Sequence, residues 1–188
     1  MMLGRFTKNQ IEYIDNLSSI ASAFSSFAKM PVTNPVEVNI LDQIRITLEL
    51  FKNTDNVTFR VHWPHESKVV IYADKEQLNG VFSNLIKNAI QAIPSGCQGQ
   101  IALNMEVKSD KVVVSVTDNG SGIPAELRNS LFTPNFTTKS SGMGLGLSIA
   151  KKYIESAGGR IWFETEEDKG SVFYFELPVM YTVEKPSA

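Results

Sequence analysis

The stretch Asp118-Asn119-Gly120-Ser121-Gly122-Ile123-Pro124 follows an apolar run and places a carboxylate at the end of an expected strand. Its two glycines let the backbone turn tightly or approach a ligand closely. An ordinary turn has the same residue types, because Asp-Asn-Gly is common in loops. The stretch continues into a long loop, residues 124–141, and such a loop in a compact domain is usually functional or mobile. Because the stretch continues into this loop, a ligand site is favoured over an ordinary turn.

An amide-bearing helix is predicted before this stretch, from Asp74 to Ile93, and Pro94 ends it. Its polar face carries Gln77, Gly80, Asn84, Asn88 and Gln91, and its apolar face carries Leu78, Phe82, Leu85, Ala89 and Ile93. The polar face is either solvated or directed at a ligand. Asparagine is a poor residue for an exposed helix interior, so Asn84 and Asn88 favour side-chain oxygens that bind something, such as Mg²⁺.

A glycine-rich segment, Thr137 to Leu147 (TTKSSGMGLGL), ends the long loop. Gly142, Gly144 and Gly146 alternate where a helix is expected to begin. Backbone N–H groups at a helix start can hold phosphate, and Lys139 adds positive potential. The spacing matches neither a Rossmann nor a Walker pattern. Hinge glycines explain this segment, taken alone, equally well.

The whole pattern predicts one α+β domain between about residues 36 and 180. We expect a two-layer α/β sandwich with a mixed, mainly antiparallel sheet covered on one face by helices. Two further helices are expected near residues 39–51 and 144–156. Strands are expected at residues 57–63, 68–72, 100–108, 111–117, 160–165 and 171–177, and the pairs joined by tight turns should be antiparallel. Residues 181–188 are expected to form a tail.

An N-terminal helix is predicted from about Gln10 to Met30, just before Pro31. Its apolar stripe suits packing against partner helices, and docking on its own domain is an equal alternative. Residues 31–35 then form a short linker.

Composition restricts the classes of partner. The chain has 18 basic and 20 acidic side chains in 188 residues, which argues against a nucleic-acid partner. A single cysteine, Cys97, cannot form an internal disulfide and fits the cytoplasm. No apolar stretch approaches the roughly 20 residues of a membrane span, and the N-terminus lacks a signal peptide. An inner-membrane anchor of a parent protein would lie outside this chain.

Together the three segments resemble, in order and separation, the Asn box and the two glycine boxes of one ATP-binding fold. Gyrase, the heat-shock chaperone of that class, mismatch-repair ATPases and histidine kinases share this fold. The segments NLIKNAIQAI, DNGSGIP, LFTPNFTTK and GMGLGLSIAKKYIESAGG resemble histidine kinases of the nitrogen-regulation type, over roughly residues 36–178. The helix ending in FSSFAKMP is similar to the second helix of a dimerisation domain, so residues 1–31 would be part of the phosphoacceptor domain.

The resemblance implies ATP and Mg²⁺ as cofactors. Asp118 would accept a hydrogen bond from the adenine amino group, and Asn88 would supply an oxygen to Mg²⁺. Asn84, Asn88 and Lys139 would act in catalysis, with Lys139 reaching the terminal phosphates. The nucleotide-binding residues implied by the resemblance are Asn84, Asn88, Asp118, Gly120, Gly122, Ile123, Phe132, Thr138, Lys139, Gly142, Gly144, Leu145, Gly146, Leu147 and Ser171.

Asn84 distinguishes transfer from hydrolysis within this resemblance, because hydrolytic relatives carry there a Glu that activates water. An amide is not a general base, so we expect phosphoryl transfer to a protein histidine. His65 lies between two expected strands, and the acceptor is expected on a preceding helix outside this chain. The implied partners are the histidine-bearing dimerisation domain of a homodimeric parent kinase and the receiver domain of a response regulator. A serine kinase of the anti-sigma type and a non-catalytic nucleotide-binding module remain alternatives.

Overall fold

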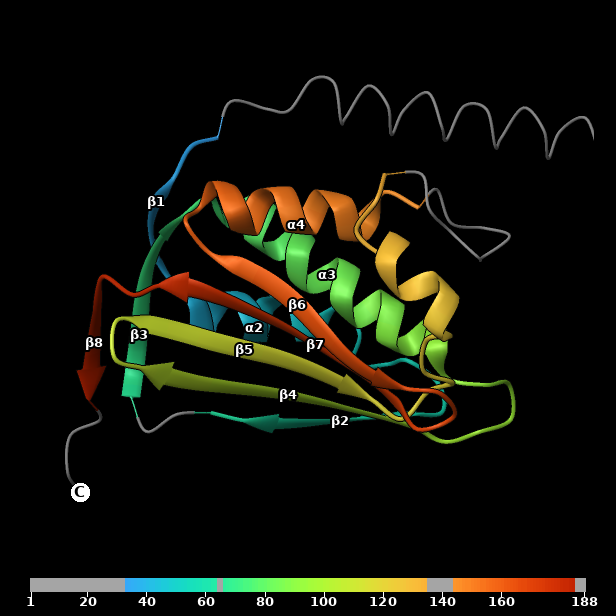
Figure 1. Cartoon of the computed structure of the whole chain (residues 1–188). Helices are drawn as coiled ribbons and strands as arrows, with labels where there is room; N and C mark the ends of the chain where they lie inside the picture. Colours follow the sequence, from blue (N-terminus) through green and yellow to red (C-terminus); the bar gives the residue numbers. More distant parts are fainter. Residues whose placement is uncertain (1–32, 64–65, 135–143, 185–188) are drawn as a thin grey trace, which may run out of the picture.

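A computed structural model describes residues 33–63, 66–134 and 144–184 (Figure 1). The elements are β1 (Val36–Asn39), α2 (Ile40–Glu49), β2 (Val57–His62), β3 (Glu66–Ala73), α3 (Lys75–Ala92), β4 (Gly99–Lys108), β5 (Lys111–Asp118), the 3₁₀ helix η1 (Ala125–Ser130), α4 (Gly146–Ser156), β6 (Arg160–Glu166), β7 (Gly170–Pro178) and β8 (Tyr181–Glu184). The helix predicted at residues 10–30 lies outside the described residues. Among the helices that are described, none is long and apolar enough to cross a membrane.

The main sheet has five strands in the order β2-β4-β5-β7-β6. β2 pairs with β4 in parallel, whereas β4–β5, β5–β7 and β6–β7 are antiparallel. The expected mixed, mainly antiparallel sheet is therefore confirmed. Ser109 has a positive φ of 54° in the tight turn that joins β4 to β5, and Asp168 has one of 60° in the turn that joins β6 to β7.

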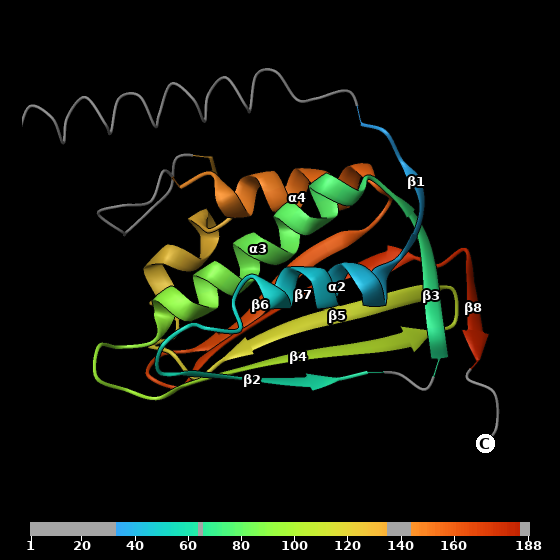
Figure 2. The same ribbon diagram turned by 180° about the vertical axis from the view of Figure 1, so that it is seen from behind.

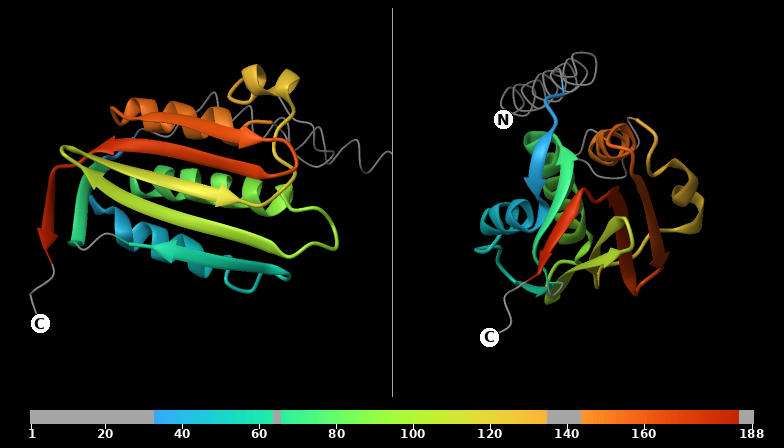
Figure 3. Two further views of the ribbon diagram at one scale, coloured as in Figure 1. Left: turned by 60° about the horizontal axis from the view of Figure 1, so that its bottom comes forward. Right: turned by 90° about the vertical axis from the view of Figure 1, so that its left-hand side faces the viewer.

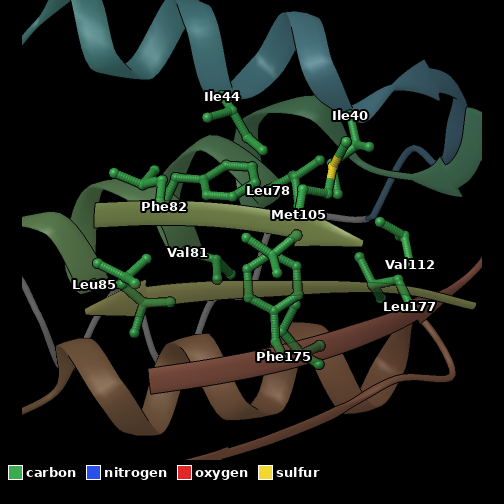
Figure 4. Packing of buried hydrophobic residues seen from close by; sticks show 14 of the residues in the cluster. Ile40, Ile44, Leu78, Val81, Phe82, Leu85, Met105, Val112, Phe175 and Leu177 are labelled. Carbon is green, nitrogen blue, oxygen red and sulfur yellow. The ribbon is translucent and has the colours of Figure 1, made fainter. Parts of the chain in front are cut away.

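Helices α2, α3 and α4 cover one face of this sheet, as the views from behind and from the end show (Figures 2 and 3). Their apolar side chains meet those of the strands in a single core (Figure 4). Phe82 of α3 and Phe175 of β7 lie at its centre, with ring centroids 5.4 Å apart. The predicted apolar face of α3 is confirmed, because Leu78, Phe82, Leu85 and Ala89 are all buried.

A second sheet of three strands, in the order β1-β3-β8, stands at one end of the molecule (Figure 1). The expected tail at residues 181–188 instead begins with β8, which pairs antiparallel with β3. β1 and β8 have four residues each. Such short strands show no clear alternation in sequence, since one of their faces is specified by only two residues.

Candidate functional site

The described parts of the three sequence segments meet at one end of the molecule, on the right in Figure 1. The loop after β5 packs on the end of α3, because the Ser121 N–H donates to the Ala92 carbonyl at 3.0 Å. The start of α4 lies against the middle of α3, where Asn84 Nδ2 donates to the Gly146 carbonyl at 3.2 Å. Residues far apart in sequence are thus joined by hydrogen bonds into one site.

Asp118 is the last residue of β5 and is only 4% exposed. Its Oδ1 accepts hydrogen bonds from the Gly120 N–H at 2.9 Å and the Ser171 N–H at 3.3 Å. Ser171 lies directly across the ladder from Asp118. Buried carboxylates are tolerated where they accept hydrogen bonds, so the backbone around Asp118 is built to hold an acceptor at this position.

Glycines allow the backbone segments around Asp118 to touch. A Cβ on Gly120 would lie 2.5 Å from the Ala92 carbonyl oxygen. Gly122 has a φ of +66°, and its Cβ would lie 2.1 Å from the carbonyl oxygen of Glu166, the last residue of β6 before the turn to β7. Any side chain at either position would push the loop away from α3 or from the turn. Positions 120 and 122 therefore require glycine for steric reasons.

A hydroxyl pair links the same loop to the β6–β7 hairpin. The Ile123 N–H donates to Thr165 Oγ1 at 3.0 Å, and Thr165 Oγ1 lies 2.9 Å from Ser171 Oγ. Thr165 also donates to the Gly170 carbonyl at 3.1 Å. Ile123 is partly buried against the core. The Ser121 carbonyl also accepts a hydrogen bond from the Asp168 N–H at 2.8 Å, so the loop is fixed on both sides of Gly122.

The start of α4 is held by its leucines and by Asn84. Leu145 is buried, and Leu147 packs against the core. Gly144 has a φ of +64°, and a Cβ on Gly146 would lie 3.1 Å from Asn84 Oδ1. Glycine at 146 thus lets the amide of Asn84 approach the first turn of the helix.

Asn88 is one turn beyond Asn84 on α3, is partly buried and makes no side-chain hydrogen bond to the part of the chain that the structure describes. Phe132 lies beside β6, with its ring 6.0 Å from that of Phe163, and the Lys151 ammonium lies 5.8 Å from the Phe132 ring. Predicted contacts of Thr138, Lys139 and Gly142 fall outside the described residues.

The remaining polar residues of α3 do not continue this site. Gln91 is exposed. Gln77 is buried near the other end of the helix, and its Nε2 has no hydrogen-bond partner among the described residues. Gln77 lines a pocket with a volume of about 380 Å³ together with Asp74 and Met180. None of the predicted site residues that the structure describes lines that pocket. The predicted polar face of α3 therefore does not form one site: Asn84 lies in the candidate site, whereas Gln77 lines a separate pocket.

Sequence reasoning missed Thr165 and Gly170. Gly170 has a φ of +110°, and a Cβ there would lie 2.0 Å from the Asp118 carbonyl oxygen. The predicted hairpin of residues 160–165 and 171–177 could have identified Thr165, because it is built from two neighbouring strands that pair. Pairing its strands places Thr165 opposite Ser171, as the observed register has it.

Comparisons with known proteins identify the family of this chain. A family model described as histidine kinase-, DNA gyrase B- and HSP90-like ATPase matches residues 73–180. The sensor histidine kinase ZraS of Escherichia coli strain K12 is 44% identical over 116 residues, which are 62% of this chain and 24% of that protein. The chain thus spans about a quarter of the length of that relative.

Two solved structures are also similar. The catalytic domain of histidine kinase ThkA has a TM-score of 0.69 and 40% identity, covering 77% of this chain and 95% of that one. ThkA in complex with the response regulator protein TrrA has a TM-score of 0.73 and 33% identity, covering 95% of this chain and 52% of that one. The nitrogen-regulation subgroup stays a prediction. This chain belongs to the family of histidine kinase-, DNA gyrase B- and HSP90-like ATPases, among the catalytic domains of histidine kinases.

Proposed function

We propose that this chain is the ATP-binding catalytic domain of a two-component sensor histidine kinase, which transfers the γ-phosphoryl group of ATP to a histidine on a dimerisation domain. The observation that carries the proposal is the convergence of α3, the loop after β5 and the start of α4. Asn84 contacts Gly146, and Gly120 contacts Ala92. ATP needs an acceptor for its base and donors for its phosphates close together, and these segments would supply both.

The base would bind beside Asp118. A carboxylate accepts hydrogen bonds only, so it suits the exocyclic amino group of adenine. The close packing of Gly120 and Gly122 keeps the loop backbone against the same carboxylate. Ser171 places a hydroxyl next to it, because its own N–H donates to Asp118.

The phosphates would bind at the start of α4, where unpaired backbone N–H groups and the helix dipole favour anions. Gly142, Gly144 and Gly146 would let the backbone approach them, and Lys139 would add a positive charge. Leu145 is buried beneath this turn, which gives the N–H groups a fixed direction.

Mg²⁺ would be held by Asn88 together with the phosphates. No group of three His, Cys, Asp or Glu side chains within the described ranges could hold a metal ion. An amide oxygen supplemented by phosphate oxygens and water fits this ion, which usually keeps several waters. When bound, Mg²⁺ neutralises charge that develops on the transferred phosphoryl group.

Transfer to an imidazole is favoured over hydrolysis by Asn84. Its amide cannot take a proton from water, and its Nδ2 is engaged with Gly146. An imidazole nitrogen brings its own lone pair to the γ-phosphorus while the bond to the ADP oxygen breaks. Fixed donors at the start of α4 and Lys139 would stabilise the charge on the equatorial oxygens.

The partners follow from this chemistry. The acceptor would be a histidine on the dimerisation domain of a homodimeric parent kinase, and the phosphoryl group would pass on to a response regulator receiver domain. A relative, ThkA, has been solved with a response regulator protein, which supports the second partner. We place the reaction in the cytoplasm, where ATP is available.

Incubation with radiolabelled ATP and Mg²⁺ tests the proposal. The chain alone should stay unlabelled, and an added helix pair bearing an acceptor histidine should become labelled. The label should be acid-labile, as phosphohistidine is, and should disappear with EDTA. Acid-stable labelling would indicate a serine kinase, and ATP binding without transfer to any acceptor would indicate a non-catalytic module. Either result would overturn the proposal, as would strong labelling of His65.

A further inference from the structure

Thr165 occupies a position beside the predicted base site that neither the motifs nor the comparisons assign. It lies in β6, directly across the ladder from Ser171, which in turn lies across from Asp118. Residues directly opposite in antiparallel pairs share a face of the sheet. The three side chains therefore stand in one row on the face that carries the helices.

The hydroxyl of Thr165 has all its hydrogen-bonding capacity in use. A hydroxyl has one proton to donate and two lone pairs that accept. The Ile123 N–H at 3.0 Å can only donate, and the Gly170 carbonyl at 3.1 Å can only accept. Thr165 must therefore give its single proton to Gly170. Its second lone pair is left for the hydroxyl of Ser171, 2.9 Å away.

This arrangement fixes the direction of the Thr165–Ser171 contact. Ser171 donates its only hydroxyl proton to Thr165, so its Oγ offers lone pairs alone to anything else it meets. Asp118, which accepts the Ser171 N–H at 3.3 Å, is also an acceptor-only group when ionised. Two side chains that can only accept then stand side by side.

We infer that Thr165 determines base specificity by holding Ser171 as a hydrogen-bond acceptor. The inference rests on the proposed function, in which Asp118 and Ser171 face the base. Acceptors on both side chains favour a purine with an exocyclic amino group, as in adenine. The adenine amino group has a proton for each acceptor, whereas hypoxanthine or guanine offers only its N1–H beside C6 and sets its carbonyl oxygen against the second acceptor, which leaves polar groups unpaired.

Thr165 also anchors the Ile123 N–H, so a purely structural role has to be separated from this one. Thr165→Val keeps the β-branched shape and removes the hydroxyl. It would leave the Ile123 N–H without its partner and would free the Ser171 hydroxyl to rotate and donate. Thr165→Ser keeps the hydroxyl and serves as the matched control.

The test compares the dissociation constants of ATP and inosine triphosphate, measured by calorimetry on the full chain with Mg²⁺. We expect Thr165→Val to lower the preference for ATP about fivefold, the worth of one neutral hydrogen bond, and Thr165→Ser to keep the wild-type preference. Equal weakening of both nucleotides by Thr165→Val would show a structural role alone and overturn the inference.

A double-mutant cycle with Ser171→Ala locates the effect. If Thr165 acts through the Ser171 hydroxyl, Thr165→Val should not change the preference further in the Ser171→Ala background. A further change in the nucleotide preference in that background would overturn the inference that Thr165 acts through Ser171. Measurements on the wild type distinguish failure of the proposed function from failure of this inference. If the wild type does not bind ATP, the proposed function is refuted. If the wild type binds ATP and Thr165→Val has the same preference for ATP over inosine triphosphate, only this inference is refuted.

Discussion

Asp74 and Asp118 stand at the ends of two strands and both accept hydrogen bonds from backbone N–H groups, but their partners differ. Asp74 follows β3 and caps α3: its Oδ1 accepts from Glu76 at 2.9 Å and Gln77 at 3.1 Å. Its Oδ2 accepts from Asn34 at 2.9 Å. Asp118 accepts from Gly120 and from Ser171, a residue 53 positions further along the chain.

The difference shows how one residue type serves two purposes. A cap satisfies the first N–H groups of its own helix and depends on neighbours two and three residues ahead. Asp118 is instead buried, and its distant partner ties β5 to β7. We therefore expect Asp74 to contribute to the free energy of unfolding and Asp118 to contribute to nucleotide affinity.

Replacing Asp118 should have the largest effect on nucleotide affinity. Asp118→Asn keeps the shape but offers a donor where an acceptor is needed, so ATP affinity should fall by about 10- to 100-fold, the worth of a hydrogen bond to a charged group. Titration calorimetry measures this loss, with Asp74→Asn as the control that leaves affinity unchanged. An unchanged affinity in Asp118→Asn would remove Asp118 from the binding site.

Gly170→Ala tests the packing that supports Asp118. The new Cβ would lie 2.0 Å from the Asp118 carbonyl oxygen at a φ of +110°, so we expect a loss of about 2–3 kcal/mol in the free energy of unfolding. Gly158 is the matched control: its φ is +77°, but the nearest atom to an added Cβ is 3.6 Å away. Gly158→Ala should cost about 1 kcal/mol. Equal losses in urea unfolding would mean that the contact with Asp118 is unimportant.

Asp74→Ala should lower the free energy of unfolding by about 1 kcal/mol, the usual cost of losing a helix cap, with ATP affinity unchanged. Asp55→Ala changes an exposed aspartate outside any helix and should alter stability by less than half as much, about 0.5 kcal/mol at most. Urea unfolding of both variants measures the difference. A change in ATP affinity for Asp74→Ala would contradict the expectation that Asp74 contributes to stability and Asp118 to nucleotide affinity.

The smallest expected effect is on acid stability. Partial burial acts to raise the pKa of Asp74, but the N–H groups of Asn34, Gln77 and Glu76 together lower this pKa below its ordinary value. A lowered folded-state pKa contributes stability at neutral pH that is lost as the pH falls below about 4. Urea unfolding between pH 7 and acid should therefore show a shallower decline for Asp74→Asn than for the wild type. Parallel curves would contradict this contribution.

The sequence predicted those parts of the site that local patterns encode. The apolar face of α3 repeats with the helical period, and Leu78, Phe82 and Leu85 are buried as expected. The turns at Ser109 and Asp168 joined antiparallel pairs, as predicted. The aspartate after an apolar strand was recognised because residue type and position coincided.

Other features depend on contacts that no short segment contains. The parallel pairing of β2 with β4 joins strands separated by a helix, and β8 pairs with β3 across most of the chain. The expected tail became a strand because an edge of β3 was available to it. Likewise, the contact between Asn84 and Gly146 bridges 62 residues.

By itself the sequence determined the helices α2, α3 and α4, the antiparallel hairpins and the side-chain chemistry of the candidate site, because period, turn residues and side-chain chemistry act over a few residues. Only the tertiary structure decided which of those groups meet. It made Asp74 a cap, joined Asp118 to Ser171 in the candidate site, and placed Thr165 against Ser171. The physical reason is that a hydrogen bond of about 3 Å requires its donor and acceptor to be brought together by packing of whole elements.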